Sequence, residues 1–416
     1  MNAPISIYIH VPFCAAKCAY CDFASFPNRL RDADAYFYAL NAGIESWSDT
    51  LKNCEIQTVF FGGGTPTIVN PERIVRTLST LFAHSNVNNN AEITIEGNPG
   101  TLNAEKLRAY RRAGINRLSL GAQSMNDETL RFIGRIHTAK QVAEAVSMAR
   151  DIGFANLNLD LIYALPGQTL DDWRRTLEAA ITLKPEHISA YSLIVEEGTE
   201  MFRRVACGEC AVPNEDDCIN MQRAATQTLT QAGYARYEIS NYAKAGFECK
   251  HNIAYWRRYE YLGFGCAAHS MFGGRRFANP SDLSAYLAGE RRVQEENLTL
   301  QDAIEETLML GTRMCEGVSL EKWAREFGFR LERKPAVQKL EAAGIVRVSN
   351  DRLSLTERGT KHCTVDTLVD ICNALRVTPN LLLQDSLTDE VLGMDMSPFA
   401  CSLMSGFANV LREHDL

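Results

Sequence analysis

Ser6-Ile-Tyr-Ile-His-Val-Pro-Phe-Cys14-Ala-Ala-Lys-Cys18-Ala-Tyr-Cys21 places three cysteines directly after a short apolar strand. Their C-x3-C-x2-C spacing puts them on one tight loop. Three thiolates on such a loop can each hold one iron of a cubane cluster, which leaves the fourth iron without a protein ligand. An iron of this kind is open to chemistry, so the spacing predicts a reactive [4Fe–4S] site.

Spacing alone leaves two further roles open for these cysteines. They could be buried free thiols, or zinc ligands completed from elsewhere in the chain. Structural zinc takes four ligands, and no second pair of cysteines or histidines follows at a matching distance. Cys207 and Cys210 form a separate C-x2-C without a second pair, and we interpret them as incidental thiols.

Composition and charge are those of an ordinary globular chain. It has 416 residues, 46% of them hydrophobic and 23% charged, and a formal net charge of -8. This length predicts one large domain with one or two small ones. No basic block indicates a nucleic-acid partner, and no apolar run is long enough for a transmembrane segment. The start Met1-Asn-Ala-Pro lies too close to the first strand for a signal peptide. Thirteen mostly isolated cysteines then indicate thiols and ligands in the cytoplasm rather than disulfides.

Apolar runs typical of strands alternate with amphipathic helical patterns. A helical stripe is formed, for example, by Ile74, Leu78 and Leu81. Six strand–helix units with right-handed crossovers predict a parallel α/β sheet, which periodicity alone cannot assign as open or as curled into a partial barrel. The predicted strands are residues 6–9, 58–61, 92–96, 117–121, 156–161 and 187–192.

Polar and glycine-rich residues gather at the ends of these strands. Gly62-Gly-Gly-Thr-Pro66 follows the second strand, Glu96 ends the third, Gln123 follows the fourth and Asp160 lies at the end of the fifth. Ligands of parallel α/β sheets bind at the carboxyl ends of the strands, so we expect one ligand site there. The glycine-rich loop lacks the lysine of a phosphate loop, and a tight turn without a ligand stays open for it.

Around the cysteines, Tyr8, Phe13, Tyr20 and Phe23 complete a pattern that resembles the radical S-adenosylmethionine (SAM) superfamily, in its coproporphyrinogen oxidase-like branch. The resemblance implies a partial (β/α)6 TIM-like barrel and SAM bound at the open iron of a [4Fe–4S] cluster. The implied cluster ligands are Cys14, Cys18 and Cys21. The implied SAM contacts are Tyr8, Gly63, Gly64, Thr65, Glu96, Gln123, Arg135 and Asp160. Ala164 departs from the family, which usually has glycine there, and should only tighten its turn.

Three features distinguish families within this branch. Coproporphyrinogen III oxidases have a longer arm before the cluster loop and a fourth cysteine where this chain has Phe23. The stretch His251-Asn-Ile-Ala-Tyr255-Trp256 resembles a motif of the HemW family of heme chaperones. The resemblance implies that His251, Tyr255 and Trp256 contact heme, since a histidine can ligate its iron and aromatic rings can pack on the porphyrin. Cys249 is an alternative iron ligand, and a hydrogen-bonded structural residue is the alternative for His251.

The resemblance therefore implies a cytoplasmic protein that binds heme and delivers it to acceptor hemoproteins, supplied with electrons by a reductant such as flavodoxin or ferredoxin. Two alternatives stay open. One is an oxygen-independent coproporphyrinogen III oxidase of porphyrin biosynthesis, so the sequence leaves open whether the chain is an enzyme. The other is a DNA-binding regulator that acts through the C-terminal segments.

We expect four segments along the chain. They are a radical SAM barrel over residues 1–240, a barrel-closing segment over 241–299, a winged-helix-like α+β domain over 300–360 and a helical tail over 361–416. Helices over 304–313, 319–327 and 334–343, followed by a hairpin turning at Asn350-Asp351, predict the winged shape. Residues 364–386 resemble the last helices of Cro/repressor-type helix-turn-helix domains. The two helices that would dock such a domain are missing, so we expect no DNA binding.

Overall fold

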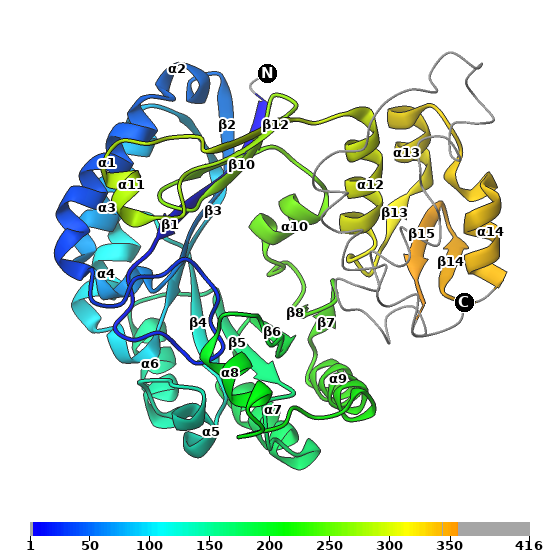
Figure 1. The fold of residues 1–416 in the computed structure, drawn as a ribbon, viewed down its shortest axis with the longest axis horizontal. Helices are drawn as coiled ribbons and strands as arrows, with labels where there is room; N and C mark the ends of the chain where they lie inside the picture. The colour runs from blue at the N-terminus through cyan, green and yellow to red at the C-terminus, as the bar shows by residue number, and fades with distance from the viewer. Residues whose placement is uncertain (1–2, 343, 357–416) are drawn as a thin grey trace.

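The computed structural model describes residues 3–342 and 344–356. The predicted helical tail and the helix-turn-helix-like stretch lie outside the described residues. Within the described part of the chain, one sheet has twelve strands and a second has three. Figure 1 shows the large sheet with helices along its outer side, and a smaller helical and β-sheet part beside it.

The middle of the large sheet is parallel and contains the predicted strands. Each neighbour in the order β1-β2-β3-β4-β5-β6 pairs in parallel with the next. The carboxyl ends of these strands therefore meet at one edge of the sheet. The strands are β1 (Ala3–Val11), β2 (Cys54–Gly63), β3 (Asn86–Gly97), β4 (Arg117–Gln123), β5 (Leu157–Tyr163) and β6 (His187–Ser192).

The helices that connect these strands have strong start signals. Thr138 caps the helix α6 and Thr169 caps α7, each in a capping box. The apolar stripe of each helix packs on the sheet, as Val142 and Val146 of α6 do. The helices are α1 (Ala33–Glu45), α2 (Ser48–Leu51), α3 (Pro71–Ala83), α4 (Ala104–Arg112), α5 (Asp127–Phe132), α6 (Ala139–Asp151), α7 (Leu170–Thr182), α8 (Glu200–Ala206) and α9 (Glu215–Gln231), with 3-10 turns η1 (Leu30–Asp32), η2 (Pro66–Ile68) and η3 (Pro99–Thr101).

Residues 241–299, predicted to close the barrel, add strands at both of its edges. Next to β6 lies the antiparallel strand β8 (Asn241–Ala243), which pairs in turn with β7 (Ala235–Arg236). On the other side, β9 (Tyr261–Phe264) pairs in parallel with β1. The edge continues through β10 (His269–Phe272), β11 (Arg275–Ala278) and β12 (Gln294–Asn297), with helices α10 (Lys250–Trp256) and α11 (Leu283–Leu287) between strands. In the described residues β7 and β12 do not pair, so the large sheet does not close on itself, as a partial barrel requires.

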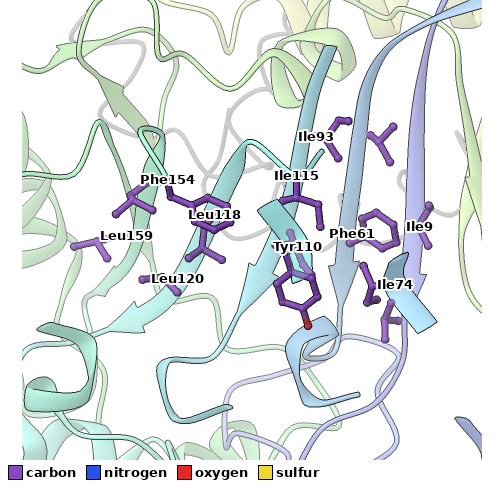
Figure 2. Packing of buried hydrophobic residues seen from close by; sticks show 14 of the residues in the cluster. Ile9, Phe61, Ile74, Ile93, Tyr110, Ile115, Leu118, Leu120, Phe154 and Leu159 are labelled. Atoms are coloured by element: carbon purple, nitrogen blue, oxygen red, sulfur yellow. The ribbon is translucent and has the colours of Figure 1, made fainter. Parts of the chain in front are cut away.

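The main hydrophobic core lies between the parallel strands and the helices outside them. Figure 2 shows Ile9, Phe61, Ile93 and Leu118 from neighbouring strands in one layer, with Ile74 of α3 beside them. All five side chains are buried. Burial on both faces explains why these strands have nearly continuous apolar sequences.

Ala164 lies in the turn after β5, at a position where the family usually has glycine. Its φ is 60°, in the left-handed region that favours glycine. Glycine would therefore adopt this backbone conformation with less strain than alanine. We expected alanine only to tighten the turn, and that expectation leaves out the strain.

The C-terminal part has a core of its own around Trp323 and Leu353. Its hairpin turns at Asn350 and Asp351, whose φ angles of 49° and 60° suit a two-residue turn, as expected. Its elements are α12 (Leu300–Gly311), β13 (Val318–Ser319), α13 (Leu320–Phe327), η4 (Leu331–Arg333), α14 (Pro335–Ala342), β14 (Val346–Ser349) and β15 (Arg352–Leu355). No helix of the described residues is apolar enough over sufficient length to cross a membrane.

Two isoleucines offer a matched test of the barrel core. Ile95 on β3 is fully buried, whereas Ile194, just after β6, is 56% exposed. We expect Ile95→Ala to lower the free energy of unfolding by about 2–5 kcal/mol, because the lost side chain leaves a cavity. Ile194→Ala should change it by less than about 0.5 kcal/mol. Urea unfolding followed by circular dichroism measures both, and equal effects would contradict this assignment of the core.

Candidate functional site

The three cysteines lie on the loop between β1 and η1. Cys14, Cys18 and Cys21 are free thiols and partly exposed. Burial raises the pKa of Cys14 and Cys21, and the neighbouring Cys18 raises both further, so the three sulfurs lie within electrostatic range. Among the described residues no three potential ligands gather around a single point that could hold a metal ion. The cysteines of a cubane each hold a different iron and need not converge on one point.

The glycine-rich loop packs directly on the cysteine loop. The Gly64 amide donates to the Val11 carbonyl at 2.9 Å, and the Thr65 amide donates to the Phe13 carbonyl at 2.7 Å. A Cβ on Gly64 would lie 2.7 Å from that Phe13 oxygen, so only glycine fits. The Thr65 hydroxyl then lies 3.5 Å from the sulfur of Cys14. This loop is therefore required for packing whether or not it also contacts a ligand.

Gly63 makes a second close approach, to a histidine that sequence reasoning missed. Its φ is 107°, and a Cβ there would lie 2.4 Å from the ring of His10. His10 is buried and bonded through Nδ1 to the Tyr8 hydroxyl at 3.0 Å and through Nε2 to the Ala24 carbonyl at 2.8 Å. The hydrogen bonds orient Tyr8 and pin the far end of the cysteine loop. The sequence signal that could have identified His10 is its position between Tyr8 and Cys14.

Arg135 and Gln123 lie on the other side of the cysteines. One Arg135 amino group lies 3.4 Å from the Cys18 sulfur and the other donates to the Gly121 carbonyl at 2.5 Å. Its Nε is buried and has no acceptor among the described residues. Gln123 ends β4 with a φ of 65°, and its amide lies close to Gly121. The guanidinium can thus neutralise a thiolate and still offer an N–H to a ligand carboxylate.

Glu96 and Asp160, the two predicted carboxylates, line one cavity of about 180 Å³. The carboxylate of Asp160 accepts from the Ser119 hydroxyl at 3.0 Å and from the Asn158 amide at 2.8 Å. Burial raises the pKa of Asp160. Burial, and then the charge of Asp160, raises the pKa of Glu96 to about 8. Glu96 also accepts from the Gly63 backbone, which connects this cavity to the glycine-rich loop.

Arg117 lines the cavity and is a second residue that sequence reasoning missed. It is buried at the start of β4 and donates to the Asn156 side chain at 2.8 Å. Its Nε has no acceptor in the described part of the chain. Nearby, both ring nitrogens of His187 are bonded, to Asn158 at 2.6 Å and to the Tyr237 hydroxyl at 2.8 Å. An arginine inside an otherwise apolar predicted strand was a signal that could have identified this position.

His251 lies in the same cavity, on α10. Its Nδ1 is bonded to the Thr58 hydroxyl at 2.7 Å and its Nε2 to the Tyr255 hydroxyl at 3.0 Å. The ring stacks on Phe60 with 5.0 Å between centroids. Burial lowers the pKa of His251 to about 3, so the imidazole is neutral. Heme iron could bind this histidine only after one of its two hydrogen bonds opens. As it stands, His251 is a hydrogen-bonded structural residue, which is the alternative that the sequence left open.

Glu92 fixes the start of α10. Its carboxylate accepts from the backbone amides of Lys250 and His251, each at 3.1 Å, and from the Cys249 thiol at 3.5 Å. Burial raises the pKa of Cys249 to about 12, which keeps it a thiol. The carboxylate therefore decides which face of α10 meets the cavity.

The three predicted heme contacts are not brought to one place. His251 and Tyr255 line the cavity. Trp256 instead lines a separate groove beside α12, β13 and α13, where the Arg313 guanidinium lies 4.3 Å from its ring centroid. Figure 1 shows α10 between the sheet and these C-terminal elements.

Comparisons with known proteins agree with this geometry. Residues 8–180 match the radical SAM superfamily and residues 298–360 match the HemN C-terminal domain. A solved structure of coproporphyrinogen III oxidase (HemN) from Escherichia coli, described as a radical SAM enzyme, covers 90% of this chain and 91% of its own, with a TM-score of 0.78 and 24% identity. The open barrel, the three-cysteine loop and these matches define a radical SAM protein. Membership implies a [4Fe–4S] cluster and SAM as cofactors.

Curated relatives narrow the assignment. Proteins named heme chaperone HemW are 36% identical in Lactococcus lactis, over 88% of this chain and 94% of the relative, and 39% identical in Escherichia coli, over 86% and 95%. A radical SAM domain-containing protein 1, mitochondrial, of Danio rerio is 34% identical over 76% of this chain and 74% of its own. The chain belongs to the HemW family.

The raised pKa of Glu96 gives a pH-dependent prediction. Between its ordinary value of 4.5 and about 8, the folded state holds a proton that the unfolded state has lost, so stability falls as pH rises through this range. We expect Glu96→Gln to flatten that fall in the apoprotein. Melting temperatures measured between about pH 5 and pH 8 test this, with the exposed Glu178→Gln as control. Parallel curves for all three proteins would show that Glu96 ionises normally.

Proposed function

We propose that this protein is a heme chaperone, which binds heme and delivers it to acceptor hemoproteins. The observation that carries this proposal is its 36–39% identity to proteins named heme chaperone HemW over 94–96% of their length. We further propose that it works in the cytoplasm and receives electrons from a protein such as flavodoxin or ferredoxin.

The cluster ligands in this proposal are Cys14, Cys18 and Cys21. When bound and given one electron by the reductant, the cluster would supply the reductive cleavage of SAM. The chain itself supplies donors next to the sulfurs, because Thr65 lies beside Cys14 and Arg135 beside Cys18. These donors offset part of the negative charge that three thiolates bring together.

The proposed SAM contacts form two adjoining groups. Gly63, Gly64, Thr65, Gln123 and Arg135 surround the cysteine loop, whereas Glu96 and Asp160 line the cavity. The Gly63 backbone donates to Glu96 and so joins the groups. Tyr8 is oriented at the boundary by His10. This arrangement suits a ligand with a carboxylate at one end and hydroxyl groups at the other, since Arg135 can pair with the first and the two acids can accept from the second.

Heme contact by the motif on α10 is also proposed. His251 can ligate iron if its bond to Tyr255 or Thr58 opens, and Cys249 is the alternative ligand. Trp256 offers an aromatic face on the other side of the helix.

No observation favours a coproporphyrinogen oxidase, because the likeness to that structure is at 24% identity and shows the fold alone. Phe23, which replaces the fourth cysteine, is 63% exposed beside the cluster loop.

The chaperone proposal predicts heme binding without porphyrin oxidation. We expect the anaerobically reconstituted protein to bind hemin with a distinct Soret band, and to convert no coproporphyrinogen III in the presence of SAM and reductant. In His251→Ala the Soret band should shift or weaken if His251 is the ligand; an unchanged band would leave Cys249 as the candidate. Multiple-turnover decarboxylation without hemin binding would replace the chaperone with the oxidase.

The cysteine assignment has its own test. Changing Cys14, Cys18 or Cys21 singly to Ser should abolish the broad charge-transfer absorption of the reconstituted protein, since each would hold a different iron. The control is Cys207→Ser, because Cys207 is an exposed thiol outside the loop. Iron and sulfide analysis measures the outcome, and full four-iron content in the three loop variants would refute the assignment.

A further inference from the structure

A groove of about 460 Å³ runs between the end of α10 and the C-terminal elements. Its walls come from residues 256–259 on one side and from β13 and α13 on the other. We call it the Trp256–Trp323 groove after the two indoles that line it. It is separate from the cavity that contains Glu96, Asp160 and His251.

Both indoles of the groove have an unused donor. The Nε1 groups of Trp256 and Trp323 are buried and have no acceptor among the described residues. Trp323 as a whole is only 1% exposed. Buried polar groups nearly always have a partner, so two unpaired donors on residues that line one groove single it out as a place for a ligand with acceptors.

The groove also has an excess of positive charge, although the chain as a whole is acidic. Arg257 and Arg352 share the single carboxylate of Glu316, at 2.8 Å and 3.6 Å. Lys322 forms no ion pair with any acid in the described part of the chain, and its ammonium lies 5.3 Å from the ring centroid of Tyr259. Glu326 is a second acid in the lining, while Arg258 and Arg325 pair with acids outside it. Three cations therefore face two carboxylates, which leaves an excess of positive charge for an anionic ligand.

The volumes of the groove and the cavity differ, and this difference favours the groove as the site for heme. Pockets for drug-sized ligands usually hold about 300–1,000 Å³. The groove, at about 460 Å³, lies in that range, and the cavity, at about 180 Å³, lies below it. The cavity also adjoins the residues proposed to contact SAM. The groove is thus the larger of the two spaces, and a ligand there does not require a hydrogen bond of His251 to open.

We propose that the Trp256–Trp323 groove is the docking site for heme, a flat aromatic molecule with two carboxylates. Trp256 and Tyr259 offer aromatic faces to the macrocycle. The indole N–H groups, with Lys322 and Arg352, donate to the carboxylates. The site needs no iron ligand. This inference rests on the proposed function and names the place where its ligand binds.

Titration of the reconstituted full-length protein with hemin and with iron-free protoporphyrin IX tests the site. We expect wild type to bind both, because the groove recognises the ring and its carboxylates. Lys322→Glu should weaken both by about tenfold or more, since it replaces a pairing cation with a repelling anion. Trp323→Phe, which keeps an aromatic ring and removes the N–H, should weaken both several-fold. Circular dichroism checks that each variant is folded.

Two controls distinguish binding in the groove from a general charge effect and from ligation by His251. Lys339→Glu makes the same charge change on the exposed face of α14, outside the groove, and should bind like wild type. His251→Ala should leave protoporphyrin IX affinity unchanged. Wild-type affinity for both porphyrins in Lys322→Glu and Trp323→Phe would overturn the groove while leaving the chaperone proposal intact. A wild-type protein that binds neither porphyrin would overturn the proposed function and this site with it.

Discussion

The contact between Gly64 and the backbone of Phe13 is the constraint on which the cofactor site depends. A side chain at Gly64 would lie 2.7 Å from the Phe13 carbonyl oxygen, so the two loops can meet only because glycine has none. The parallel pairing of β1 with β2 brings both loops to this point. From here Thr65 reaches the first cysteine, and the Gly63 backbone reaches Glu96 in the cavity. One close packing contact thus aligns the cysteine loop with the strand ends.

Much of this arrangement could be predicted from the sequence, because parallel strands place their carboxyl ends at one edge. Glu96 and Asp160 lie on β3 and β5, which are separated only by β4, and this order follows from simple crossovers. Arg135 lies in the loop after α5 and contacts Cys18. Periodicity could not predict this position, so its prediction came from the family resemblance.

The rest depends on contacts between distant segments, which no local pattern encodes. His251 is paired with Thr58, 193 residues earlier in the chain, and Glu92 orients α10 from another strand. These contacts turn His251 toward the cavity and leave Trp256 on the side of the groove. Residues of one six-residue motif therefore line two separate spaces. The short strands β9 to β12 lack a strong alternating pattern, which explains why the barrel-closing segment was predicted without its individual strands.

The most direct test of a single cofactor site is electron paramagnetic resonance of the reduced, reconstituted [4Fe–4S] protein with and without SAM. If the loop of three cysteines leaves one iron open beside Arg135, Gln123 and Glu96, SAM reaches that iron and changes its electronic environment. We expect the spectrum of the reduced cluster to shift when SAM is added. Identical spectra at saturating SAM would contradict the claim that the cysteine loop and the strand ends form one site.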